Sequence, residues 1–195
     1  MQLWVGLGNP GADYAMHRHN VGYMAADVIA SEYSFGPWKS KFQGLIADGR
    51  IGTAKVLLLK PATFMNDSGR SVREAIRFYK LETAAVTVFY DELDLAPFKV
   101  KVRIGGGAAG HNGIRSTVAH IGEDFRRVRI GIGHPGHKDR VTGHVLGNYA
   151  KAEIDDLAHL LGAVAAEAEW LAKSDDVRFM NDVAQRTIGR MTAQL

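Results

Sequence analysis

The chain has 195 residues, 46% of them hydrophobic, which is enough for a sizeable core, and we predict a single domain over residues 1–195. It contains no cysteine, which excludes disulfides, thiolate metal sites and cysteine nucleophiles and suits a reducing cytoplasm. The net charge of +3 permits an anionic partner without requiring one. We expect no secretory signal and no membrane span, because the chain has no basic segment leading into an apolar core and no long uncharged apolar run.

Hydrophobic patterns predict the strands. Three apolar segments are typical of buried strands: Gln2–Leu7, a strand containing Leu57–Leu59 that follows the segment 44–51, and Val86–Tyr90. Residues 98–104 and 127–132 alternate apolar and basic side chains, as strands with one covered face do. The segments 44–60 and 98–104 have an antiparallel character, so we expect a mixed sheet.

Helical periodicity fills the intervals between these strands. The predicted helices are Asn20–Ser34, Ser68–Lys80, one that begins at Asn112, Lys151–Lys173, and Asp175–Met191 with an apolar stripe that ends at Met191. Strands interleaved with helices predict an α/β fold, in which a twisted mixed sheet carries helices on both faces.

A glycine-rich turn, G-L-G-N-P-G at residues 6–11, matches the G-x-G-x-x-G spacing of dinucleotide-binding turns. Such a site needs a helix that begins inside the motif and an acidic residue at the end of the next strand, about 20 residues on. Here Pro10 interrupts the turn, helical periodicity begins only at Asn20, and the next candidate strand begins near Gly44. We therefore expect a turn that leaves a central strand, and a dinucleotide-dependent oxidoreductase is the disfavoured alternative.

Polar residues gather where four predicted strands end. His19 follows the first strand, Asn66 lies in "KPATFMNDSG" after the second, Asp91 in "YDELDL", and Asn112 in "GGGAAGHNG". Because α/β proteins place their sites in loops at strand ends, we predict that these side chains share one cleft. Taken singly, each has a structural alternative, since asparagine next to Pro or Gly often stabilises a turn or caps a helix.

The common hydrolase and nucleotide-binding signatures G-x-S-x-G, H-E-x-x-H and the P-loop are missing from the sequence. A histidine oriented by a carboxylate can take a proton from water, and carboxamides can hold that water or an oxyanion. Water is then the predicted nucleophile, and the substrate must be labile, such as an activated ester. A metal site on His17-x-His19 or His134-x-x-His137 is the weaker alternative, because neither pair has a nearby carboxylate at a familiar spacing and "GHPGH" is typical of a turn.

Basic residues occupy the polar faces of two alternating strands: Lys99, Lys101 and Arg103 on one, Arg127 and Arg129 on the other, with Lys138 and Arg140 beyond. If the strands are neighbours, these residues form one patch suited to phosphates, and the alternative is a solvated strand face. A labile ester beside a phosphate-binding face suggests an esterified nucleic acid.

Five motifs resemble the bacterial peptidyl-tRNA hydrolase family in order and spacing. They are "VGLGNPGADY" with "RHNVG", "KPATFMNDSG", "YDELDL", "GGGAAGHNGIRS" and "RVRIGIGHPG". The resemblance covers residues 3 to about 149 and implies hydrolysis of the ester that joins a peptide to the terminal ribose of tRNA. It also implies one α/β domain that acts in the cytoplasm as a monomer, without a metal or other cofactor.

The same resemblance assigns roles by motif position. It implies that His19 is the catalytic base and that Asp91 orients it. Substrate-binding residues would be Asn9, Tyr14, Phe64, Met65, Asn66 and Asn112, and the tRNA 5′-phosphate would bind Arg103 and Arg129.

The sequence departs from the family pattern at three positions. Arg103 stands where Lys is common, Ala109 replaces a frequent glycine, and His17 replaces a small hydroxyl residue. None of these changes removes a proposed catalytic residue. An RNA-binding relative that has lost hydrolysis is therefore the disfavoured rival within the same fold.

Overall fold

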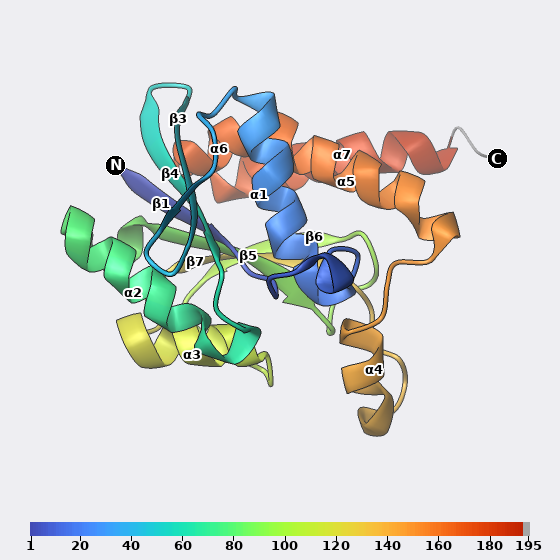
Figure 1. The fold of residues 1–195 in the computed structure, drawn as a ribbon. Coiled ribbons are helices and arrows are strands. Elements are labelled where there is room, and N and C mark those ends of the chain that lie inside the picture. Colours follow the sequence, from blue (N-terminus) through green and yellow to red (C-terminus); the bar gives the residue numbers. More distant parts are fainter. Residues whose placement is uncertain (193–195) are drawn as a thin grey trace.

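The core of the molecule is a seven-stranded mixed sheet in the order β2-β3-β4-β1-β5-β7-β6 (Figure 1). The structure is a computed structural model that describes residues 1–192, with side chains through Ile188. Strands β4, β1, β5 and β7 run parallel, whereas β2, β3 and β6 are antiparallel to their neighbours. The bounds are β1 Gln2–Gly6, β2 Lys39–Lys41, β3 Gly44–Ile51, β4 Ala54–Pro61, β5 Val86–Glu92, β6 Val100–Ile104 and β7 Arg126–Gly131.

Helices cover both faces of the sheet, as the sequence predicts (Figure 1). Alternate residues of β1 show the division: Leu3 and Val5 pack with α2 and α3, and Trp4 packs with α1, α5 and α7. The helices are α1 Val21–Glu32, α2 Ser68–Tyr79, α3 Asn112–Ile121, α4 Val141–Val145, α5 Ile154–Ala166, α6 Ala168–Ala172 and α7 Asp176–Thr192. Met191, where the predicted apolar stripe of α7 ends, has its side chain outside the described residues. Across residues 1–192, no helix combines the length and the hydrophobicity needed to cross a membrane.

The predicted long helix over Lys151–Lys173 is wrong in one respect, because it divides at Glu167 into α5 and α6. The Tyr33 hydroxyl donates to the carbonyl of Ala165 at 2.8 Å, a carbonyl that an unbroken helix would use for its own ladder. Strand β2 and helix α4 are too short and too exposed to leave a periodic pattern, and the sequence did not predict them.

The glycine-rich turn after β1 serves close packing. A Cβ on Gly22, in the first turn of α1, would lie 2.3 Å from the carbonyl oxygen of Phe89 and 2.5 Å from the amide nitrogen of Leu7. A Cβ on Gly6 would lie 2.2 Å from the carbonyl oxygen of Gly22. Helix α1 thus lies directly on the backbone of β1 and β5, and it begins at Val21, well outside the G-x-G-x-x-G turn. The residues 6–11 thus form a turn that leaves a sheet strand, as the sequence predicts.

The carboxyl ends of the four parallel strands meet at one edge of the sheet, where the polar loops leave β1, β4 and β5. Strand β6 does not end there. Its last residue, Ile104, pairs with Arg126 at the start of β7, while Asp91 pairs with Ile130 four residues further along β7. Residues 105–111 must therefore run back about 13 Å, the rise of four strand residues, to bring α3 to this edge.

We predict that Gly22→Ala lowers the free energy of unfolding by about 3 kcal/mol or more, because backbone atoms on two strands must move to admit the methyl group. Calorimetry should show a fall in Tm of about 6–12 °C for a chain of this size.

The matched control is Gly162→Ala on the exposed side of α5, where an added Cβ has no neighbour within 4 Å. This replacement should stabilise the protein by about 0.5–1 kcal/mol through helix propensity alone. A Gly22→Ala protein with wild-type Tm would contradict the packing argument.

Candidate active site

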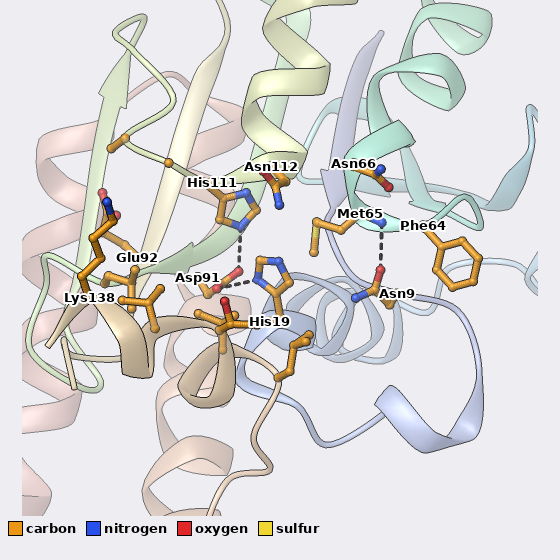
Figure 2. A pocket seen from close by; sticks show the side chains of 17 residues that line it. Asn9, His19, Phe64, Met65, Asn66, Asp91, Glu92, His111, Asn112 and Lys138 are labelled. Atoms are coloured by element: carbon orange, nitrogen blue, oxygen red, sulfur yellow. Dashed lines mark hydrogen bonds and ion pairs between the residues drawn. The ribbon is translucent and has the colours of Figure 1, made fainter.

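A cavity of about 580 Å³ opens at the carboxyl edge of the sheet, between the loops after β1, β4 and β5, the start of α3, and α4 (Figure 2). Most residues that the sequence assigns to substrate or catalysis line this cavity: Asn9, His19, Phe64, Met65, Asn66, Asp91 and Asn112. The predicted shared location is therefore confirmed: His19, Asn66, Asp91 and Asn112 line one cavity.

The carboxylate of Asp91 joins two imidazoles at the floor of this cavity. Its Oδ2 lies 2.8 Å from His19 Nδ1, and its Oδ1 lies 2.8 Å from His111 Nε2 (Figure 2). Asp91 is buried in β5, so desolvation by itself raises its pKa. The interactions with His111 and His19 outweigh desolvation and hold the pKa of this carboxyl well below its usual range. Asp91 is therefore an acceptor for both rings.

The hydrogen bonds determine which ring nitrogen carries a proton. His111 Nδ1 accepts the backbone N–H groups of Gly113 and Ile114 at 3.1 and 3.2 Å, so the proton of His111 is on Nε2 and points at Asp91. His19 donates its Nδ1 proton to the other carboxylate oxygen, which leaves the Nε2 lone pair of His19 as its remaining polar site in the cleft. This is the form of a histidine that can accept a proton from a bound water.

His111 is a site residue that sequence reasoning missed. It precedes Asn112 in the same "GHNG" stretch and caps the N-terminus of α3. The centroid of its ring lies 4.8 Å from that of the His19 ring and 5.1 Å from that of the Tyr90 ring. A histidine directly before a predicted helix was the available signal, since side chains there accept the free N–H groups of the first turn.

The three residues His19, Asp91 and His111 also lie close enough together to hold a metal ion. The chemistry of His111 does not fit that use, because a neutral histidine ligand keeps a proton on its second nitrogen. Here the second nitrogen, Nδ1, is an acceptor for two backbone N–H groups. Of the other histidines considered, His134 and His137 accept backbone N–H groups of their own turns and belong to no such cluster in the described chain.

A chain of amide contacts fixes Asn9. The side chain of Asn20 bonds both the N–H and the carbonyl of Asn9 at 2.9 Å, and Asn9 Oδ1 accepts the N–H of Met65 at 2.8 Å. The oxygen of the Asn9 carboxamide is thereby used, so its Nδ2 donor is the group available to a ligand. The carboxamide of Asn112 is oriented in the same way, because its Oδ1 accepts a hydrogen bond from the guanidinium of Arg115 at 3.1 Å. Both carboxamides therefore offer hydrogen-bond donors to the cleft.

One wall of the cleft, formed by α4, was not predicted. His144 of α4 contacts the carbonyl of Ile132, just beyond β7, through Nε2 at 3.0 Å. Arg18, next to His19, bonds the carbonyl of Asn148 and the carboxylate of Glu153, both at 3.0 Å. The segment that follows α4 is thus attached directly to the turn that carries His19.

The predicted basic patch is confirmed in part. Strands β6 and β7 are neighbours, with Arg103 opposite Arg127 and Lys101 opposite Arg129. Arg129 lies 3.3 Å from Glu92, and Arg103 donates to the carbonyl of Gly107 at 3.2 Å. Arg127, however, is fully buried, so the prediction that it shares an exposed phosphate-binding face is wrong.

Three of the predicted binding residues lie outside the cavity: Tyr14, Arg103 and Arg129. Tyr14 packs edge-on against His17, with ring centroids 5.2 Å apart. Lys138 is the basic residue that reaches the cavity itself.

Comparison with known proteins identifies the family. A sequence profile of peptidyl-tRNA hydrolase matches residues 3–190. The peptidyl-tRNA hydrolase of Erythrobacter litoralis is 74% identical over 186 residues, which are 95% of this chain and 98% of that protein. The chain belongs to the peptidyl-tRNA hydrolase family. The family resemblance inferred from the five motifs is therefore confirmed.

Other relatives support the assignment. The peptidyl-tRNA hydrolase of Zymomonas mobilis is 63% identical over 95% of this chain and 98% of its own length. The crystal structure of the peptidyl-tRNA hydrolase of Acinetobacter baumannii is similar with a TM-score of 0.88 and 40% identity, over 94% of each chain. The α/β fold predicted from the sequence is thus a peptidyl-tRNA hydrolase fold.

The lowered pKa of Asp91 predicts how stability depends on pH. An unfolded aspartate titrates near pH 4, while the folded carboxyl titrates lower, so the unfolded chain binds more protons between these two pKa values. The stabilisation by ionised Asp91 is present above about pH 4 and is lost as the pH falls toward the folded pKa. Asp91→Asn should flatten the dependence of Tm on pH below about pH 4. Equal acid-side slopes for the two proteins would contradict the prediction.

Proposed function

We propose that this chain hydrolyses the ester bond between the peptide and the terminal ribose of peptidyl-tRNA, releasing free peptide and tRNA. The observation that carries the proposal is the Asp91–His19 pair, which directs the unprotonated nitrogen of a histidine into a cleft. Membership of the peptidyl-tRNA hydrolase family supports the choice of substrate. The cellular role is the recycling of tRNA from aborted translation.

In the proposed reaction, His19 is the general base and water is the nucleophile. Nε2 of His19 takes a proton from water as the water oxygen attacks the ester carbonyl carbon. Asp91 holds the Nδ1 proton of His19 and stabilises the imidazolium that forms. When the tetrahedral intermediate collapses, the bond to the ribose oxygen breaks and His19 returns its proton to that oxygen.

The carboxamides position the substrate. Asn9 and Asn112 each offer Nδ2, because their oxygens are engaged by Met65 and Arg115. Such donors suit peptide carbonyls and the oxyanion of the intermediate. Asn66 and the exposed ring of Phe64 extend the same side of the cleft and provide a polar and an apolar contact for the peptide (Figure 2).

The body of the tRNA is proposed to lie on the side of the cleft where the basic residues are found. Lys138 lies at the opposite side from Phe64 and Asn9 (Figure 2). Arg103 and Arg129 lie on the neighbouring strands β6 and β7, and their partly exposed guanidinium groups are proposed to bind the 5′-phosphate. Tyr14, beside the loop after β1, is proposed to contact the tRNA terminus.

We propose further that the protein acts as a monomer in the cytoplasm and needs no metal or other cofactor. The cysteine-free sequence suits a reducing compartment. The hydrogen-bonding of His111 argues against a metal at the Asp91 centre. Light scattering with and without tRNA tests the oligomeric state.

The first experiment compares N-acetyl-aminoacyl-tRNA with the same aminoacyl-tRNA carrying a free amino group, in chelator-treated buffer. We expect rapid release of tRNA from the acetylated ester and slow release from the free one. Binding without release would support the RNA-binding rival. Tight binding of a nicotinamide or flavin cofactor would support the oxidoreductase alternative.

The role of His19 is tested by His19→Ala, which should lower kcat by about 10²–10⁴-fold because the base is lost. Affinity for tRNA should remain close to wild type, since His19 makes no phosphate contact in this scheme. His159→Ala is the control: His159 lies on α5, where its Nε2 bonds the carbonyl of Arg186, and the variant should keep full activity. A His19→Ala enzyme with a near-wild-type rate would remove the base assignment.

The role of Arg129 is tested by Arg129→Ala, which should raise KM and reduce the slope of log K against log salt by about one, as expected for one lost phosphate contact. Titration of tRNA at several salt concentrations measures the slope. Arg50→Ala on β3 removes an equal charge at a different strand and should leave the slope unchanged. An unaltered slope in Arg129→Ala would exclude a phosphate contact.

A further inference from the structure

The fully buried guanidinium of Arg127 makes no ion pair with a carboxylate of the described residues. Burying a charge is costly unless its donors are satisfied, so this position needs an explanation that a solvated strand face would not. Two of its nitrogens donate to successive backbone carbonyls, Nη1 to Gly107 at 2.6 Å and Nη2 to Gly106. Its Cζ lies 4.6 Å from the centre of the Phe125 ring.

Ordering the segment to which Arg127 donates costs conformational entropy. Residues 105–111 carry α3 back to the carboxyl edge, and four of them have a positive φ: Gly105, Gly106, Ala109 and Gly110. Glycine loses the most conformational freedom on folding, and Ala109 adopts the left-handed region against its steric preference. The backbone bonds of this segment lie near its two ends, from Gly105 N–H to Phe125 and from His111 N–H to Ala108.

The far end of this segment is the catalytic centre. His111 follows Gly110 and bonds Asp91, which in turn bonds His19. The ring of Tyr90, adjacent to Asp91 in β5, packs edge-on against His111. A shift of the glycine segment therefore moves one of the two imidazoles that orient Asp91.

We propose that Arg127 is a positioning residue for the hydrolysis proposed above: it holds the 105–110 segment so that His111 orients Asp91, and it does not bind tRNA phosphate. The inference rests on that proposed function. It assigns different tasks to two arginines that stand two residues apart on one strand, Arg127 to the loop and Arg129 to the tRNA.

The test is Arg127→Met, which keeps an unbranched apolar side chain and removes the guanidinium with its charge and its donors. We expect kcat to fall by about 10- to 100-fold through misplacement of the catalytic groups, with KM for the acetylated substrate and the salt slope unchanged. Unchanged kcat with a raised KM and a flatter salt slope would overturn the proposal in favour of phosphate binding.

The matched control is Arg126→Met, on the neighbouring residue of β7. Arg126 contacts Asp176 and the carbonyl of Leu171, on the side of the sheet away from the loop. This variant should lose stability and keep kcat. If it loses as much kcat as Arg127→Met, the effect is general destabilisation and the proposal fails.

Two conservative variants keep the test decisive if Arg127→Met does not fold. Arg127→Lys keeps the charge, whereas Arg127→Gln keeps a donor without the charge, so each retains at least one N–H donor on this face of β7. Positioning predicts that both retain the wild-type salt slope and show intermediate kcat values. Phosphate binding predicts that only the lysine variant retains the slope, and this result would overturn the proposal.

A spectroscopic readout separates this inference from the proposed function. Nitrogen NMR of the imidazoles should show His111 of the wild type protonated at Nε2 alone, and Arg127→Met should show an averaged tautomer. If wild-type enzyme fails to release tRNA, the function proposal fails while this readout still tests Arg127. If wild type is active and Arg127→Met leaves both the His111 signals and kcat unchanged, the positioning role is wrong.

Discussion

The arrangement of this site depends on one buried carboxylate. Asp91 is the penultimate residue of β5, which lies between β1 and β7, so its backbone position is determined by the core rather than by a loop. Each of its oxygens takes one imidazole, and the two bonds together determine the orientation and the protonated nitrogen of both rings. The surrounding segments bring donors to this acceptor: the turn after β1 brings His19, and the start of α3 brings His111. A carboxylate that accepts on both sides holds two distant parts of the chain together.

Much of the fold follows from local patterns in the sequence. Apolar runs predict β1, β4 and β5, and alternation predicts β6 and β7, because one face of each strand must be buried. The division of Lys151–Lys173 could not be predicted, since it depends on a hydroxyl from Tyr33, more than 130 residues away in the chain. Likewise α4 has five residues and no periodic stripe, and its place is determined by contacts such as those of Arg18 and His144.

The predicted members of the cleft share one property: they lie in polar segments beside predicted strands. That rule places His19 and Asn66 for a sound physical reason, since parallel strands end at one edge. Asn112 also lies in the cleft, but for a different reason. Strand β6 ends at the opposite edge of the sheet, and residues 105–111 carry the chain back to the edge where the parallel strands end. Sequence alternation also puts Arg127 and Arg129 on the same face. It cannot show which of them a returning loop covers, and this long-range contact leaves Arg127 fully buried and Arg129 partly exposed.

The glycine contact between α1 and the strands has a consequence for redesign of this enzyme. His19 and Asn20 immediately precede the first turn of α1, where Gly22 leaves no room even for a methyl group against Phe89 and Leu7. The location of His19 is thus determined by contacts between backbone atoms, which substitution of neighbouring side chains does not change. Directed evolution toward other acyl esters has freedom elsewhere, at the exposed ring of Phe64 and along the short helix α4. The residues proposed to contact the peptide can therefore be varied without moving the proposed base.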